Sequence, residues 1–120
     1  MIVRIADLCS IKRELDRLSA FLEEKQVIGD ALFHSKLVFA ELVGNIIRHS
    51  KAQAEVESKV QDGFVQLTVR ATDGYIPPQK SECSDVYAES GRGLYLVDAV
   101  CYSREETADG VKILIRIENK

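Results

Sequence analysis

The sequence predicts an α+β fold, a two-layer sandwich in which helices pack on one face of a mixed, mostly antiparallel sheet. Two segments, 54–60 and 64–71, alternate between apolar and polar residues, and the turn sequence at 61–63 separates them as in a β-hairpin. Apolar residues recur at helical spacing over 11–22 and again over 31–50. The length of 120 residues suits one domain that spans the chain.

The first half of the chain is expected to form a strand, two helices and the hairpin. Residues 2–5 alternate and predict a short strand. Ser10 precedes the first helix as a candidate N-cap, and Gly29 is expected to end or interrupt that helix. Asp30 can cap the second helix, which is predicted over about 31–50.

The second half begins with a long loop and ends with two strands. The stretch from Thr72 to Ser90 contains glycine, two prolines and scattered polar residues, and a loop of this length is typical of a lid. An apolar helix over 94–100 follows it. Strands are predicted near 102–106 and at 111–117, joined by a turn at 109–110. The predicted order is β-α-α-β-β-loop-α-β-β.

The composition excludes several classes of protein. The net charge of −3 and the lack of a basic cluster argue against direct binding of nucleic acid. Cys9, Cys83 and Cys101 are widely spaced and form no CxxC motif, so a zinc site is not expected. The sequence shows no apolar run long enough to span a membrane and no signal-peptide pattern. A soluble cytoplasmic protein with reduced thiols is the expectation.

The second predicted helix carries a row of polar residues on an otherwise apolar surface. Glu41, Asn45 and His49 recur at four-residue steps, about 40° apart around the helix. One interpretation is a site for a ligand with a hard cation and a hydroxyl or water to activate; the other is a half-exposed edge that meets solvent. The apolar face comprises Leu32, Phe39, Leu42, Val43, Ile46 and Ile47, extended by Phe33, Leu37, Ala40 and Gly44.

A second candidate site lies just before the apolar helix over 94–100. Gly91-Arg92-Gly93 leads directly into it. Unpaired N–H groups at a helix N-terminus attract phosphate, and glycine lets a phosphate approach the backbone closely. A loop-to-helix junction that needs an unusual backbone conformation is the alternative interpretation.

These motifs, in this order, resemble the Bergerat-fold ATPases, the superfamily of gyrase, MutL and the sensor histidine kinases. Glu41-Leu-Val-Gly-Asn45 resembles the E-x-x-x-N motif of that superfamily, and Ser90-Gly91-Arg92-Gly93-Leu94 resembles its second glycine box. Within the superfamily the chain is most similar to the bacterial anti-sigma-factor serine kinases, whose first motif often continues to a histidine, as it does here at His49. The resemblance covers nearly the whole chain and implies the histidine-kinase-like ATPase fold.

The resemblance also implies a role for each matching residue. Asn45 would coordinate Mg²⁺ through its side-chain oxygen, and Glu41 would act as the general base for the attacking hydroxyl. Gly91, Arg92, Gly93 and Leu94 would hold the phosphates of ATP or ADP. His49 would lie close to the bound nucleotide.

The adenine-binding motif departs from the family pattern and leaves two registers open. In one register Ala71 occupies the position of the aspartate that accepts the adenine amino group. In the other, Asp73 is that aspartate, followed by Gly74, and Tyr75 stands where a glycine is expected. The second register keeps the strand's alternation, because residues 67, 69, 71 and 73 share a face.

The resemblance therefore predicts an ATP-binding regulatory protein of the anti-sigma-factor type. Its expected activity is that of a serine/threonine protein kinase acting on an anti-anti-sigma (STAS-type) protein, with a sigma factor as second partner and a homodimer left open. One alternative is a degenerate, non-catalytic module of the same fold, gated by nucleotide or free of it. A detached catalytic domain of a sensor histidine kinase ranks third.

Overall fold

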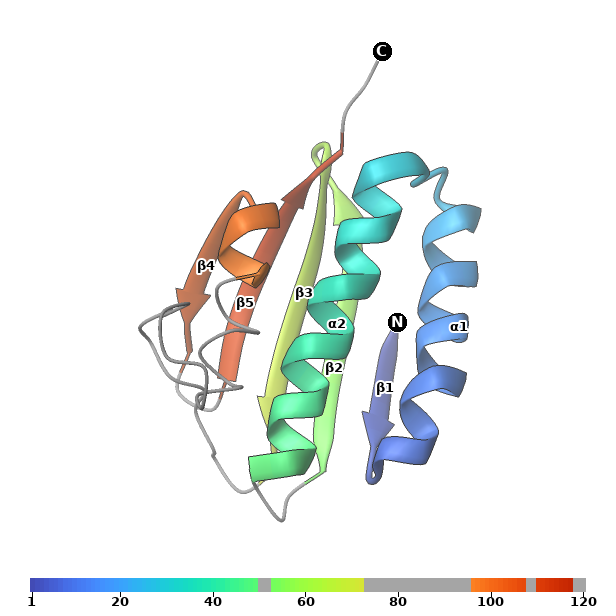
Figure 1. Ribbon diagram of the computed structural model, residues 1–120. Helices are drawn as coiled ribbons and strands as arrows, with labels where there is room; N and C mark the ends of the chain where they lie inside the picture. Colours follow the sequence, from blue (N-terminus) through green and yellow to red (C-terminus); the bar gives the residue numbers. More distant parts are fainter. Residues whose placement is uncertain (50–52, 73–95, 108–109, 118–120) are drawn as a thin grey trace.

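The computed structural model describes residues 1–49, 53–72, 96–107 and 110–117. Its sheet has five strands in the spatial order β1-β2-β3-β5-β4, and each strand pairs antiparallel with its neighbour (Figure 1). The strands are β1 (Ile2–Ile5), β2 (Ala54–Gln61), β3 (Phe64–Ala71), β4 (Ser103–Glu106) and β5 (Gly110–Arg116). The prediction of an α+β fold is confirmed, but the expectation of a mixed sheet is wrong for the described strands.

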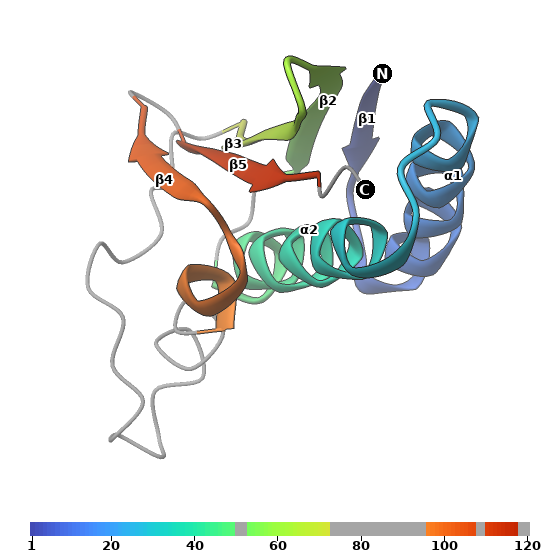
Figure 2. The same cartoon turned by 90° about the horizontal axis from the view of Figure 1, so that it is seen from above.

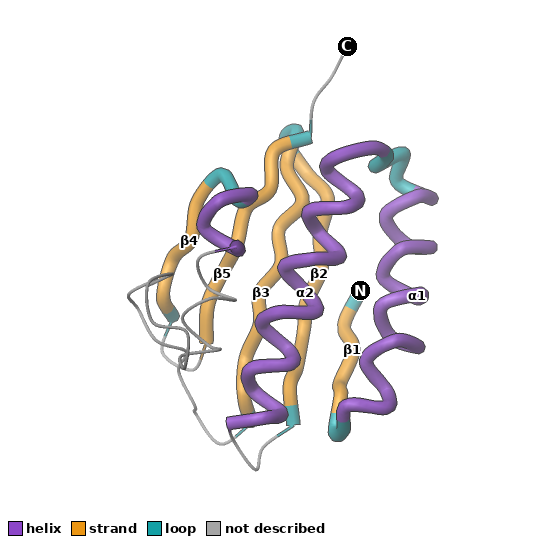
Figure 3. The backbone as a smooth tube through the Cα atoms, viewed as in Figure 1, coloured by secondary structure: helices purple, strands orange, loops and turns teal. Residues whose placement is uncertain are grey.

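The helices form the second layer on one face of this sheet. α1 (Ile11–Glu24) follows a 3₁₀ turn, η1 (Leu8–Ser10), and α2 (Gly29–His49) lies over the middle of the sheet, roughly along β2 and β3 (Figure 1). Residues 96–100 form a short helix beside β4. Viewed from above, α1, α2 and this short helix lie on the same side of the strands (Figure 2), and the tube in Figure 3 shows the same two layers.

The core lies between the two layers and follows the alternation read from the sequence. Side chains on the helix-facing side of the sheet are buried, and those on the other side are largely polar. The buried strand residues are Val3, Ile5, Ala54, Val56, Val65, Leu67, Val69, Ala71, Val111, Ile113 and Ile115. Leu18 and Leu22 from α1 and Phe39, Leu42, Val43 and Ile46 from α2 meet them.

Two predicted details of α1 are wrong. Ser10 makes no side-chain cap; instead the Asp7 carboxylate accepts hydrogen bonds from the Ser10 backbone N–H at 2.8 Å and from its hydroxyl at 2.9 Å. The helix ends at Glu24, five residues before Gly29, where Gln26 adopts a φ of +66°. Gly29 instead begins α2, with a φ of +64°, and Asp30 lies in the first turn of that helix.

The boundaries of the strands differ from the prediction by one residue at several ends. β2 extends to Gln61, β4 begins at Ser103, and β5 begins at Gly110 and ends at Arg116. The hairpin between β2 and β3 is confirmed, with positive φ at Asp62 and Gly63. The predicted lid beyond Thr72, the start of the helix over 94–100 and Ser50 lie outside the described residues.

The structure also bears on two features of the apolar residues, the position of Phe33 and the apolar character of the helices. The sequence places Phe33 on the apolar face of the second helix, yet it is 63% exposed, because it lies about 160° around α2 from the buried Ala31 and Ser35. Among the described residues no helix combines the length and the apolar character that crossing a bilayer requires.

Candidate functional site

α2 holds the polar row in a fixed position above the sheet. Leu42, Val43 and Ile46 are fully buried and pack the C-terminal half of this helix against the strands. Asn45 lies between them in the sequence and is itself 0% exposed, while Glu41, one turn earlier, is half-buried. The structure therefore brings Glu41 and Asn45 together on one stripe of α2, as the spacing predicts.

Asn45 is the most unusual residue of this stripe. Its Oδ1 accepts a hydrogen bond from Nη2 of Arg48 at 3.1 Å, and its Nδ2 has no hydrogen-bond partner among the described residues. A guanidinium can only donate, so the oxygen of the carboxamide must face Arg48 and the nitrogen must face away. Leaving a buried amide group unpaired costs about 1–3 kcal/mol, and a ligand that accepts a hydrogen bond would recover this cost.

Gly44 makes room for this contact. The side chain of Arg48 is exposed, but its guanidinium lies against the backbone of Gly44. A Cβ atom at position 44 would stand 3.3 Å from Nη1 and 3.4 Å from Nη2 of Arg48. A side chain at position 44 would therefore require the guanidinium to shift by a few tenths of an ångström from its contact with Asn45.

Glu41 is available for chemistry. Its carboxylate forms no hydrogen bond or ion pair with any residue that the structure describes. It differs in this from Glu55, whose carboxylate is held by both Arg4 and Arg70 on the opposite face of the sheet. Among the described residues, the Glu41 carboxylate is therefore not committed to an ion pair.

Most of the remaining predicted site residues lie outside the part of the chain that the structure describes. His49 is the last residue of α2, and its side chain is not among those described. Six further residues lie outside the described part of the chain: Asp73, Gly74, Gly91, Arg92, Gly93 and Leu94. The predicted phosphate cradle and the Asp73 register of the adenine motif therefore remain predictions.

Ala71, the alternative adenine position, is described. It is the last residue of β3, is buried, and pairs with Ala54 of β2. It shares the helix-facing side of the sheet with Val65, Leu67 and Val69, so the alternation assigned from the sequence is confirmed. A methyl group cannot accept a hydrogen bond, so Ala71 provides no anchor for an adenine amino group.

The short helix over 96–100 is fixed to the edge of the sheet. Arg104 of β4 forms an ion pair with Asp98 at 2.8 Å, and the Cys101 N–H donates to the carbonyl of Val97 at 2.9 Å. Burial raises the pKa of the Cys101 thiol, and the nearby Asp98 carboxylate raises it further. Cys101 therefore stays protonated near neutral pH and is a poor nucleophile.

Magnesium does not fit at Asn45 in this arrangement. The side-chain oxygen that the resemblance assigns to the metal already accepts a hydrogen bond from a positively charged guanidinium. A magnesium ion would need that oxygen at about 2.1 Å and would place a second cation against Arg48. The described residues also include no group of three or more histidine, cysteine or carboxylate side chains arranged to hold a metal.

Glu14 of α1 is a buried carboxylate that the motifs in the sequence do not single out. Its side chain is only 4% exposed and pairs with Arg17 at 2.6 Å and with Arg13 at 3.7 Å. Spacing provides a signal for its burial, because Glu14 stands four residues before Leu18 and eight before Leu22, the other buried residues of this helix.

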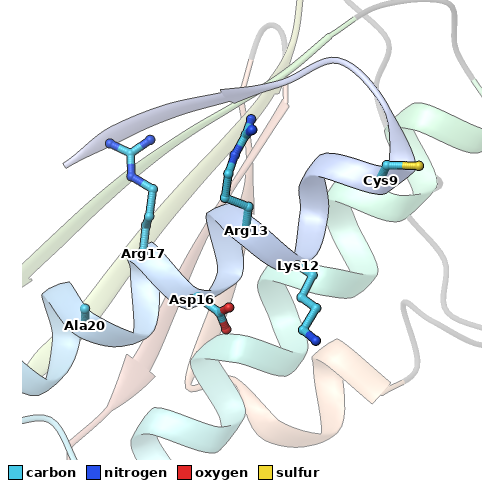
Figure 4. Close-up of a pocket in the computed structure, with 6 residues that line it drawn as sticks. All are labelled: Cys9, Lys12, Arg13, Asp16, Arg17 and Ala20. Atoms are coloured by element: carbon cyan, nitrogen blue, oxygen red, sulfur yellow. The ribbon is translucent and has the colours of Figure 1, made fainter.

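Surface hollows lined by described residues lie away from Asn45. One, of about 560 Å³, runs along α1 and is lined by Cys9, Lys12, Arg13, Asp16, Arg17 and Ala20. Arg13 and Arg17 point to the same side of the helix there, toward β1, whereas Asp16 and Lys12 point to the other side (Figure 4). A smaller hollow, of about 230 Å³, lies between the start of α2, with His34, and residues 100–102.

Comparison with known proteins identifies no relative from which a function could be inferred. No protein-family model matches the sequence, and a search of curated proteins finds no match either.

Proposed function

We propose that the protein is an ATP-binding regulatory protein of the anti-sigma-factor type, built on a Bergerat-type fold. One observation carries the proposal: the buried carboxamide of Asn45 has an unpartnered nitrogen and lies one turn after Glu41, a carboxylate without a cationic partner among the described residues. A phosphate oxygen is an acceptor that this nitrogen can use. ATP or ADP is the proposed ligand, and Asp73, Gly74 and the 91–94 segment are proposed to complete its site.

The proposed reaction is transfer of the γ-phosphoryl group to a serine or threonine hydroxyl of an anti-anti-sigma protein. The bond from the γ-phosphorus to the bridging oxygen of ATP breaks, a bond to the hydroxyl oxygen forms, and ADP leaves. Glu41 accepts the proton of the hydroxyl. A sigma factor is the proposed second partner, which the protein would bind and inhibit.

Nucleotide binding tests the proposal first. Calorimetric titration with ATP should show binding by the wild type and a loss of affinity in Asn45→Ala, because the variant lacks the amide donor. Ser58→Ala is the matched control, since the Ser58 hydroxyl is also buried without a partner among the described residues but belongs to β2. Equal affinity in wild type and Asn45→Ala, or a loss that Ser58→Ala shares, would contradict a nucleotide site at Asn45.

A second candidate function is a non-catalytic binding module of the same fold. The contact between Arg48 and the Asn45 oxygen favours it, because this contact occupies the oxygen that a catalytic metal would use. Transfer of labelled phosphate from ATP to a candidate partner distinguishes the two functions. In a kinase, Glu41→Gln should retain nucleotide and partner binding and lose roughly 10²–10⁴-fold in transfer rate.

The other outcomes of this assay assign the function differently. Partner binding without any transfer by the wild type would identify the non-catalytic module. Phosphate found on a histidine of the partner would favour the sensor-kinase catalytic domain.

A further inference from the structure

We infer that Arg48 takes the place of the metal ion at Asn45, so that this protein holds a polyphosphate chain without magnesium coordinated by the protein. The inference rests on the proposed nucleotide site and concerns how that site binds phosphate. It assigns Arg48 as a phosphate-binding residue, a role that neither the sequence motifs nor the resemblance gives it.

The contact fixes which atoms a ligand meets. Because Oδ1 of Asn45 is bonded to Nη2 of Arg48 at 3.1 Å, the carboxamide offers its Nδ2 donor rather than an oxygen. A site built on that nitrogen presents a donor to the ligand, which suits an anion and not a cation.

The guanidinium has donors left over for the same ligand. It carries five N–H groups, and one nitrogen, Nη2, is bonded to Asn45. The side chain is exposed, and its guanidinium lies within 3.5 Å of the position that a Cβ of residue 44 would take, so it is close to the helix. Guanidinium groups bind phosphate oxygens in pairs, with charge-assisted hydrogen bonds about twice as strong as neutral ones.

Charge balance explains why the cation is needed. Glu41 stands one turn before Asn45 on the same stripe, and its carboxylate pairs with no cation among the described residues. A phosphate beside Glu41 and the amide alone would meet net repulsion. Arg48 supplies the compensating positive charge, and without it a magnesium ion would have to do so.

The test is a set of calorimetric titrations of the full chain with two ligands, ATP and inorganic tripolyphosphate. Each titration is run with a chelator and again with excess magnesium. The variants are Arg48→Ala, Arg48→Lys and, as a control, Arg116→Ala. Arg116 is an exposed residue at the C-terminal end of β5, and Figure 1 shows that end opposite to the C-terminus of α2. Thermal melting checks that every variant is folded.

For each ligand, the affinity of the wild type in chelator should be similar to its affinity in magnesium, and ATP should bind more tightly than tripolyphosphate. Arg48→Ala should lose roughly ten- to a hundredfold in affinity in chelator, the usual effect of removing a hydrogen bond to a charged group, and should regain affinity when magnesium is added. Arg48→Lys should retain part of the metal-free affinity because it keeps the charge, and Arg116→Ala should bind as the wild type does. The ratio of the affinity in magnesium to the affinity in chelator is informative, because a purely structural role of Arg48 would lower both affinities by the same factor.

The outcomes separate this inference from the proposed function. ATP binding that requires magnesium in the wild type, or that Arg48→Ala leaves unchanged in chelator, overturns the inference and leaves the nucleotide site standing. Tripolyphosphate binding as tight as that of ATP, with loss in Arg48→Ala, supports the inference and overturns the assignment of an adenine nucleotide. Binding of neither ligand overturns both.

Discussion

The carboxamide of Asn45 links the stability of the protein to its proposed function. Its oxygen is bonded to Arg48, and its nitrogen is buried without a partner among the described residues. Such a group lowers stability in the unliganded protein unless a water molecule or a ligand accepts its hydrogen bond. Arg48 itself is exposed, so water can replace Asn45 as its partner.

Asn45→Leu is therefore expected to separate the two properties. Leucine is close to asparagine in shape and carries no buried polar group, so the free energy of unfolding should stay the same or rise by about 1 kcal/mol. Nucleotide binding should be lost. Urea unfolding of both proteins without ligand measures the first effect, and a clear fall in the unfolding free energy would show that the amide nitrogen has a partner in solution.

The cysteines should differ in reactivity. Cys9 is exposed, whereas Cys101 is partly buried and has a raised pKa owing to burial and to Asp98. Because the thiolate is the reactive form, alkylation of Cys101 should be slower than that of Cys9 at neutral pH and should accelerate only in more alkaline solution. Mass spectrometry of iodoacetamide-treated protein across a pH series measures both rates, and equal rates at neutral pH would contradict the expectation.

Polar contacts at its start and in its middle hold α1 in place. The turn that leads into α1 is closed by the Asp7 carboxylate, and the middle of α1 is tied by Glu14 to Arg13 and Arg17. Glu14 is buried but both arginines are exposed, so its charge is balanced at the surface. α2 relies instead on its broad apolar face, which packs on β2, β3 and β5.

The contact between Asp7 and Ser10 predicts that substitutions of these two residues lower the stability by different amounts. Asp7→Ala removes the acceptor of both hydrogen bonds and should cost about 1 kcal/mol of stability, as the loss of a cap usually does. Ser10→Ala removes only the donor of the hydroxyl bond and keeps the backbone N–H contact, so it should cost less. Chemical unfolding of the two variants decides, and a larger cost for Ser10→Ala would restore serine as the cap.

At the scale of the whole molecule, the packing of β5 against β3 requires a glycine at position 110. Gly110 was expected in a turn, but it is the first residue of β5 and pairs with Arg70 of β3. A Cβ atom there would fall on the carbonyl oxygen of Val69 and 2.8 Å from the Cα of Arg70. Because these are backbone atoms of a central strand, no side-chain rotation can relieve the overlap.

Gly110→Ala is accordingly expected to be severely destabilising, by about 3 kcal/mol or more, since β5 must separate from β3 to admit one methyl group. Gly63→Ala is the control, because a Cβ at position 63 has no neighbour within 4 Å and only the positive φ of +80° opposes it. Thermal unfolding compares the two. Similar melting temperatures would contradict a close approach of β3 and β5 at Gly110.

The sequence was sufficient for the order and type of the five strands and of α1 and α2, and for the buried face of β3. Alternation in 64–71 and helical spacing in 31–50 are properties of neighbouring residues, so they can be read without knowing what packs opposite. The same spacing placed Glu41 and Asn45 on one stripe. The sequence alone did not determine whether Ser10 or Asp7 caps the first turn, because both residue types are good caps and the backbone geometry decides between them.

Three features depended on the assembled fold. The direction of the Asn45 carboxamide follows from the position of the Arg48 guanidinium, and that position follows from the space left by Gly44. The exposure of Phe33 follows from which face of α2 the sheet covers, and the need for glycine at 110 follows from the approach of β3. Periodicity assigns a residue to a face, but only packing determines which atoms of another element meet it there.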